Sequence, residues 1–73
     1  MTIDELKTAL RRAGVPAEYY NLDGQGRDDE RLCLVQENSK WVVYYSERGV
    51  RTTEEVFGTE AEACNYILDA LTS

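Results

Sequence analysis

The chain begins and ends with segments in which apolar residues recur at helical spacing. The first segment repeats them every three or four positions, at Ile3, Leu6, Leu10 and Ala13. The last segment gathers them on one side of a helical projection, at Ala63, Cys64, Ile67, Leu68 and Leu71. Each segment therefore predicts an amphipathic helix with one buried side.

Both predicted helices begin with a capping motif. Thr2 is followed three positions later by Glu5, and Thr59 is followed in the same way by Glu62. A hydroxyl at the cap and a carboxylate three residues on can satisfy two free backbone N–H groups, so each pair predicts a capping box. Gly14 suits the left-handed residue that ends a helix, so the first helix is expected to stop there.

Between the helices the pattern changes to that of β-strands. Residues 32–36 are a short apolar run, residues 41–46 are rich in β-branched and aromatic side chains, and residues 50–57 mix valine and threonine with charges. These three segments predict three strands. Residues 19–22 predict a further short strand before them.

Two short segments predict the hairpin connections. Residues 38–39 suit a two-residue turn, which sets Leu34 opposite Val43 in the adjoining strands. Residues 47–49 suit a three-residue loop with Gly49 in its left-handed position. The three main strands therefore form an antiparallel meander.

The order of these elements predicts the fold class. A chain of 73 residues forms one domain with a small core, so residues 1–73 are expected to be a single domain. The predicted fold is α+β, a two-layer α-β-β-β-α arrangement with both helices on one face of the sheet. The short segment at residues 19–22 would add a first strand.

The alternation of side chains divides the sheet between two faces. The bulkier set is expected beneath the helices and consists of Leu32, Leu34, Trp41, Val43, Tyr45 and Phe57. The other set is Cys33, Val35, Val42, Tyr44, Val50, Thr52, Glu54 and Val56. Because helices on one side cover only that side, we expect the second set to be exposed. Its apolar contact patch would consist of Cys33, Val35, Val42, Tyr44 and Val56. The alternative is that its apolar residues are ordinary scattered surface residues. The division leaves Arg51 and Glu55 at the margin of the helix-covered face.

This exposed face and the tip of the second hairpin supply the candidate binding residues. The candidate partner-binding residues are Cys33, Val35, Val42, Tyr44, Glu47, Arg48 and Val56.

The net charge of the chain limits the classes of partner that are expected. It has 14 acidic and 8 basic residues and a net charge of -6. An acidic chain lacks the basic stripe that binds a nucleic-acid backbone or an anionic membrane, so neither is expected as a partner. It is steered instead towards basic proteins. No apolar run reaches the length of a membrane span, and the N-terminus does not read as a signal peptide, so a cytoplasmic location is expected.

Histidine is absent from the chain and cysteine occurs only twice, so two residue types common in catalytic and metal sites are scarce. The chain has no histidine, which argues against zinc binding and histidine acid–base catalysis. Cys33 and Cys64 are expected to be reduced packing residues rather than nucleophiles, and nothing supports a disulfide between them. Residues 23–30 match neither a phosphate-binding loop nor an EF-hand and are expected to be a solvated, mobile loop. We therefore expect no enzyme activity, no cofactor and no metal.

One combination of motifs suggests a family. A Gly-Val-Pro segment at residues 14–16 is followed by Leu-Cys-Leu-Val, then by Trp-Val-Val-Tyr-Tyr-Ser-Glu-Arg-Gly at residues 41–49, and then by the acidic capped helix. This order resembles a family of small bacterial proteins, mostly from actinobacteria and related Gram-positive bacteria. Some of its members resemble immunity proteins encoded beside polymorphic secreted toxins. The resemblance implies a cytoplasmic binding protein without a catalytic motif.

Two functions follow as expectations. The first is a protein-binding module, specifically an immunity-type inhibitor of a toxin or of another basic protein. The second is a structural protein that forms a homodimer through the open sheet face.

Overall fold

The computed structural model describes residues 1–22 and 30–73. In chain order the elements are α1 (Ile3–Arg12), the 3₁₀ turn η1 (Ala17–Tyr19), β1 (Tyr20–Asn21), β2 (Arg31–Glu37), β3 (Lys40–Glu47), β4 (Val50–Phe57) and α2 (Glu60–Thr72). Apart from Glu30, the loop predicted at residues 23–30 lies outside the described residues. Among the described residues, no helix is long and apolar enough to cross a membrane.

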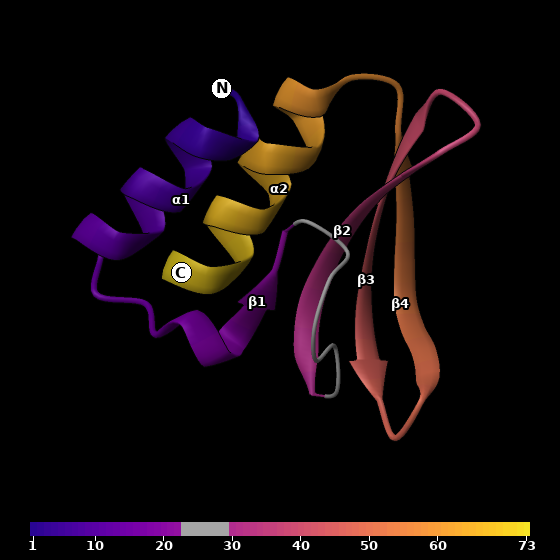
Figure 1. Cartoon of the computed structure of the whole chain (residues 1–73), viewed down its shortest axis with the longest axis horizontal. Helices are drawn as coiled ribbons and strands as arrows, with labels where there is room; N and C mark the ends of the chain where they lie inside the picture. The colour runs from indigo at the N-terminus through magenta and orange to yellow at the C-terminus, as the bar shows by residue number, and fades with distance from the viewer. Residues whose placement is uncertain (23–29) are drawn as a thin grey trace.

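The elements form two layers. Both helices lie on the same side of a four-stranded sheet, whose strand order is β1-β2-β3-β4 (Figure 1). β2, β3 and β4 pair antiparallel, as predicted. The short first strand is present as β1, and it pairs parallel with β2, so the sheet is mixed. The predicted α+β class and the placement of the helices are confirmed.

The first helix is capped as its sequence predicts. The N–H of Glu5 donates to the Thr2 hydroxyl at 3.2 Å, and the N–H of Thr2 donates back to the Glu5 carboxylate at 2.8 Å. These bonds lower the pKa of Glu5. At the other end Gly14 has a φ of 78°, and the N–H of Val15 returns to the carbonyl of Leu10 at 3.0 Å. The helix therefore ends where glycine permits the reversal.

The second helix is capped differently from the prediction. The Thr59 hydroxyl accepts from the N–H of Glu62 at 3.2 Å, as in a capping box. The same hydroxyl donates to the Glu62 carboxylate at 3.0 Å, so threonine and glutamate are joined through their side chains. Thr59 is still the residue at which α2 begins.

A carboxylate links the two helices. Their N-terminal ends lie at the same end of the molecule (Figure 1). The carboxylate of Glu60, in the first turn of α2, accepts the N–H of Ile3 in the first turn of α1 at 2.9 Å. The N-terminal end of a helix carries partial positive charge and free N–H groups, so a carboxylate there stabilises both helices.

The core lies between the helices and the sheet. Its buried members are Leu6, Leu10, Leu22, Leu34, Val43, Ala63, Cys64 and Ile67. Trp41 and Phe57 pair across β3 and β4 and pack against this cluster from its edge. The Phe57 ring also lies 5.3 Å from that of Tyr66 on α2. The set predicted to lie beneath the helices is therefore on the predicted face.

The first hairpin has the predicted turn. Asn38 and Ser39 have φ values of 50° and 67°, which identifies a two-residue type I′ turn. Leu34 lies opposite Val43, as the turn requires. The register of β2 against β3 was therefore predicted correctly.

The second hairpin differs from the prediction. Its turn is Arg48-Gly49, with φ values of 53° and 79°, and Glu47 is the last residue of β3. A two-residue turn in place of the predicted three-residue loop pairs Glu47 with Val50 and exchanges the faces of the residues that follow. Arg51 therefore lies on the sheet face turned away from the helices, and Thr52 lies on the helix side beside Tyr45.

A β-bulge then restores the predicted faces. Tyr45 pairs with Thr52, but Val43 pairs with Glu55, so β4 holds one extra residue between these pairs. Thr53, within this interval, has a φ of 51°. Beyond the bulge Val56 lies beside Val42 and Phe57 beside Trp41, as predicted.

Candidate functional site

The sheet face turned away from the helices was predicted to be an exposed patch, and this exposure was wrong for its central residues. We call it the far face, with Cys33, Val35, Val42, Tyr44 and Val56 as its apolar residues. Cys33, Val42 and Tyr44 are 1%, 4% and 6% exposed and form a second buried cluster, against which Val35 packs. The sequence placed these residues on the correct face but missed their burial.

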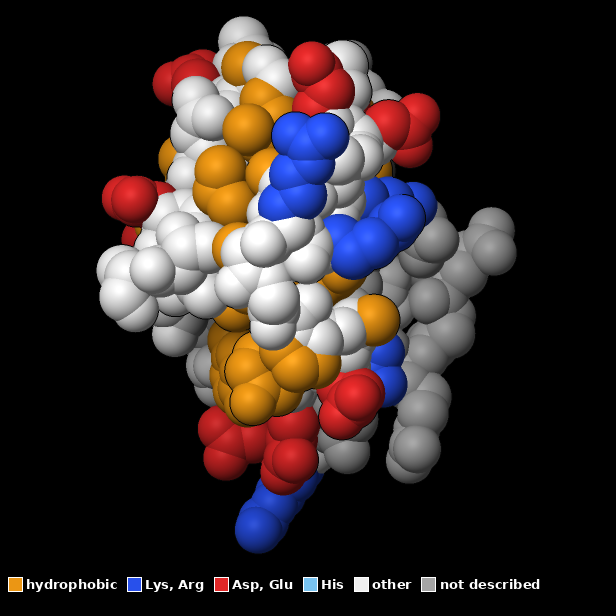
Figure 2. Space-filling model, turned by 90° about the vertical axis from the view of Figure 1, so that its left-hand side faces the viewer, with side chains coloured by type: hydrophobic (Ala, Val, Ile, Leu, Met, Phe, Trp, Pro, Cys, Tyr) orange, Lys and Arg blue, Asp and Glu red, His pale blue; other side chains and the backbone are white. Residues whose placement is uncertain are grey.

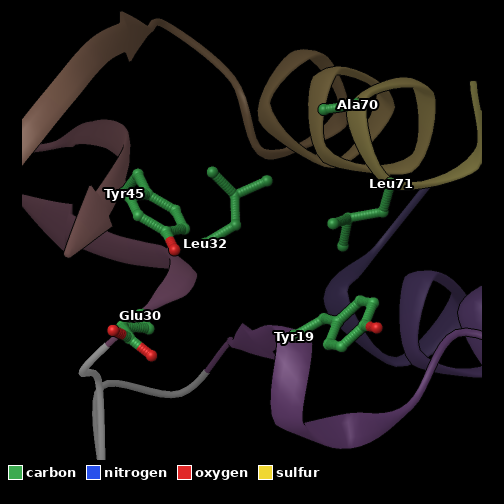
Figure 3. A pocket seen from close by; sticks show the side chains of 6 residues that line it. All are labelled: Tyr19, Glu30, Leu32, Tyr45, Ala70 and Leu71. Carbon is green, nitrogen blue, oxygen red and sulfur yellow. The ribbon is translucent and has the colours of Figure 1, made fainter. Parts of the chain in front are cut away.

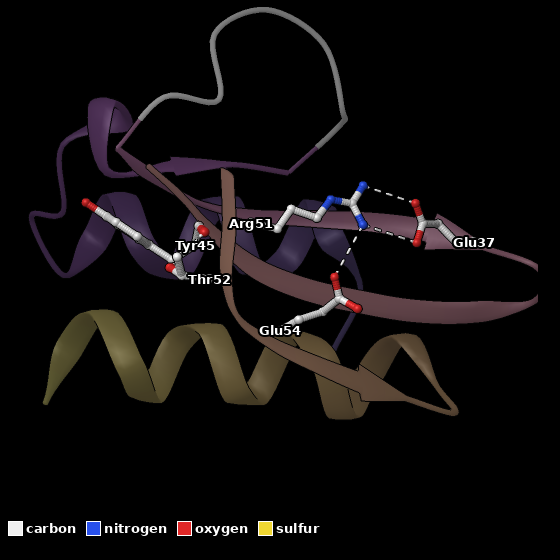
Figure 4. A network of polar contacts seen from close by, with 5 residues as sticks. All are labelled: Glu37, Tyr45, Arg51, Thr52 and Glu54. Carbon is white, nitrogen blue, oxygen red and sulfur yellow. Dashed lines mark hydrogen bonds and ion pairs between the residues drawn. The ribbon is translucent and has the colours of Figure 1, made fainter. Parts of the chain in front are cut away.

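Arg51 contributes to this burial. Its guanidinium carbon lies 4.2 Å from the centre of the Tyr44 ring. The same guanidinium forms a two-pronged bond with Glu37, at 3.4 and 3.1 Å, and an ion pair with Glu54 at 3.5 Å (Figure 4). The hydrogen bonds that Arg51 donates to the Glu37 carboxylate raise the pKa of Arg51 above its ordinary value. Polar side chains therefore lie over part of the predicted apolar patch.

The remaining predicted binding residues are exposed but separated. Val56 is 57% exposed and pairs with Val42 on the edge strand β4. Glu47 and Arg48 are exposed at the β3–β4 turn, at the opposite end of β4. The far face therefore brings four of the seven predicted residues into one cluster, with Val56 at its edge.

The helix side holds a pocket that the sequence did not predict. Its volume is about 390 Å³, and its lining residues are Tyr19, Glu30, Leu32, Tyr45, Ala70 and Leu71. Tyr45 and Glu30 stand on one side of the space, Tyr19 stands opposite them, and Ala70 and Leu71 come from α2 (Figure 3). Four described parts of the chain therefore meet here: η1, the start of β2 with the residue before it, the end of β3, and the C-terminal turns of α2.

Backbone pairing positions the sheet side of this pocket. Leu32 and Tyr45 are direct partners across β2 and β3 and share one face. The carbonyl of Tyr45 also accepts a hydrogen bond from the Thr52 hydroxyl at 3.1 Å (Figure 4). Glu30 has a φ of 56°, and its N–H donates to the carbonyl of Ser46 at 2.6 Å. A left-handed residue bonded to the neighbouring strand fixes where the Glu30 side chain leaves the backbone.

The described lining of the pocket is apolar apart from one negative group. Glu30 carries the one charge among the described lining residues, and leucine, alanine and tyrosine supply the remainder. Tyr19 is 56% exposed, so one aromatic wall faces solvent. Seen from the helix side, apolar side chains gather at the level of η1, with acidic side chains just below them (Figure 2).

The two cysteines lie on opposite sides of the sheet. Cys64 is fully buried in the core beneath the helices, and Cys33 is buried in the far-face cluster. Burial and the nearby charge of Glu60 raise the pKa of the Cys64 thiol. Within residues 1–22 and 30–73, no group of three or more potential ligand side chains could hold a metal ion.

Comparisons of the chain with protein-family models, curated proteins and solved structures found no match. The resemblance to small bacterial immunity-like proteins therefore stays a prediction.

Proposed function

We propose that this protein is a small cytoplasmic protein-binding module that captures a basic partner, and that the helix-side pocket receives a side chain of that partner. The observation that carries the proposal is the pocket of about 390 Å³ with two tyrosine rings in its lining. Tyrosine is enriched among the residues that dominate binding energy at protein interfaces, where it sits in or around such pockets.

The charge of the chain supports a basic partner. A net charge of -6 accelerates encounter with positively charged proteins and disfavours acidic ones. An immunity-type inhibitor of a toxin, expected from the family resemblance, is the specific form of this proposal. In that form the partner is a basic toxin domain, and binding in the cytoplasm prevents its action.

The far face is the weaker site for either expected function. With Cys33, Val42 and Tyr44 buried within the monomer, Val35 and Val56 are its remaining apolar contacts. A homodimer through this face would have little apolar area to bury. Light scattering at micromolar concentration should report a monomer, and a dimer that Val56→Asp dissociates would favour the homodimer instead.

The proposal is tested by locating the binding site of a purified partner. A partner recovered from the cells that encode the protein is titrated calorimetrically against the wild type and three variants. Tyr19→Ala should weaken binding about tenfold or more, because it removes an exposed aromatic wall of the pocket. Val50→Ala, a control at an equally exposed residue of β4, should change affinity less than about twofold.

The third variant distinguishes the two faces. Val56→Ala should leave the affinity unchanged if the partner binds at the pocket. If Val56→Ala abolishes binding and Tyr19→Ala does not, the far face is the binding site and the pocket proposal fails. For the toxin form, co-expression with a toxin encoded beside this gene should restore growth with the wild type and fail to do so with Tyr19→Ala.

A further inference from the structure

We infer that the pocket takes the guanidinium group of an arginine side chain carried by the partner. This inference rests on the proposed function and adds to it the chemistry of the inserted group. It follows from three features of the pocket: its negative potential, its aromatic and aliphatic walls, and the way the same chain already holds an arginine of its own.

The negative potential comes from two sources. Glu30 contributes a full charge, and no lysine or arginine is found among the described lining residues. Ala70 and Leu71 belong to the last turn of α2, where the free carbonyl groups carry partial negative charge. That turn holds no basic residue, whereas the last turn of α1 carries Arg11 and Arg12. A cation in the pocket would therefore meet both a carboxylate and the negative end of a helix.

The walls suit the two parts of an arginine side chain. Leu32 and Leu71 offer apolar surface for its aliphatic stem. The rings of Tyr45 and Tyr19, on opposite sides of the space, offer faces against which a planar cation can stack (Figure 3). A guanidinium uses such faces better than an ammonium does, because it is planar and less strongly hydrated.

On the far face, the protein already holds one of its own arginines between a tyrosine ring and a glutamate carboxylate. There the guanidinium of Arg51 lies over the ring of Tyr44 and is held by both carboxylate oxygens of Glu37. The pocket presents the same two partners, a tyrosine ring and a glutamate carboxylate, in Tyr45 and Glu30. In the pocket, an arginine of the partner would take the position that Arg51 takes on the far face.

The inference is tested with arginine blocked at both ends as an N-acetyl N-methylamide, titrated into isotopically labelled protein and followed by NMR. The shifted signals should be those of Tyr45, Ala70 and Leu71. The matched citrulline compound, which is neutral and nearly the same shape, should bind about tenfold more weakly, since it loses the ion pair and the cation–π contact. The lysine compound should bind about threefold more weakly than arginine.

A pair of variants checks the role of the carboxylate. Glu30→Gln should weaken binding of the arginine compound about threefold. The control Glu55→Gln removes the same charge from an exposed position on β4 and should leave binding unchanged. Preserved signal dispersion in both variants shows that each is folded.

Several results would overturn the inference. These are equal binding of the arginine and citrulline compounds, binding of the lysine compound as tight as that of arginine, or shifts confined to the far face. Tighter binding of free L-arginine than of the blocked compound would assign the pocket to a small metabolite instead. In each case the proposed function is judged separately, because it depends on the effect of Tyr19→Ala on the affinity for the whole partner.

Discussion

Replacing Thr53 by glycine is expected to stabilise the protein. Thr53 has a φ of 51° in the bulge of β4, a region that a β-branched side chain rarely adopts. The left-handed conformation costs a residue with a Cβ about 1–2 kcal/mol, and glycine avoids this cost. Glycine adds about 0.5–1 kcal/mol of backbone entropy to the unfolded chain. The net gain in unfolding free energy should therefore be about 0.5–1 kcal/mol, or roughly 2–8 °C in the melting temperature.

The assay is urea unfolding followed by the fluorescence of Trp41, the single tryptophan, which lies on β3 opposite Phe57 of β4. Thr52→Gly is the matched control, because Thr52 does not share the left-handed φ and its hydroxyl bonds the carbonyl of Tyr45. This control should lose about 1.5–2 kcal/mol through the lost hydrogen bond and the added entropy. If Thr53→Gly destabilises the protein as much as Thr52→Gly does, the account of the bulge is refuted.

Three further predictions concern the contacts of single side chains. Arg51→Lys should lower the unfolding free energy by about 0.5–1 kcal/mol in urea titrations, because the ammonium loses the stacking on Tyr44 and the two-pronged carboxylate bond. An unchanged unfolding free energy would show that this contact is not formed in solution. Glu60→Gln should cost about 0.5–1 kcal/mol in the same assay, since the negative charge at the Ile3 N–H is removed, and an unchanged midpoint would contradict that link between the helices. Burial raises the pKa of the Cys64 thiol above its ordinary value near 9.0, so its contribution to stability is complete below that pH and declines as the pH rises through and above it. The stability difference between the wild type and Cys64→Ala should therefore shrink in alkaline solution, and a difference independent of pH would contradict the effect.

Local sequence signals predicted the elements well, because their physical causes lie within a few residues. The Thr2–Glu5 pair and Gly14 determine where the first helix begins and ends, and both signals are readable without knowledge of the fold. Asn38 and Ser39 tolerate the left-handed conformations of a two-residue turn, so the register of the first hairpin was also predictable.

The second hairpin was harder to predict because two nearby irregularities act in opposite directions. A turn shorter than expected moved Arg51 to the far face, and the bulge at Thr53 returned Val56 to its predicted side. A threonine gives no sign in the sequence that it will adopt a positive φ. The burial of Tyr44 depended on this shift, since Arg51 reaches its ring only from the far face.

The pocket could not be predicted from the sequence. Its lining residues come from separate parts of the chain that meet only in the folded molecule, and each looks ordinary in its own segment. Tyr45 and Leu32 were expected on the helix side, which is correct. The C-terminal turns of α2 do not close fully over these two residues, so space remains beside the core at this end of the helix side.

A double-mutant cycle between the protein and its partner tests whether this pocket holds an arginine of a basic partner. With the purified partner, affinities are measured for wild type and Glu30→Gln, each against the native partner and a partner in which the inserted arginine is replaced by glutamine. We expect a coupling of about threefold or more in affinity between the two positions, because each charge matters only when the other is present. Purely additive effects at every arginine of the partner's binding surface would contradict it.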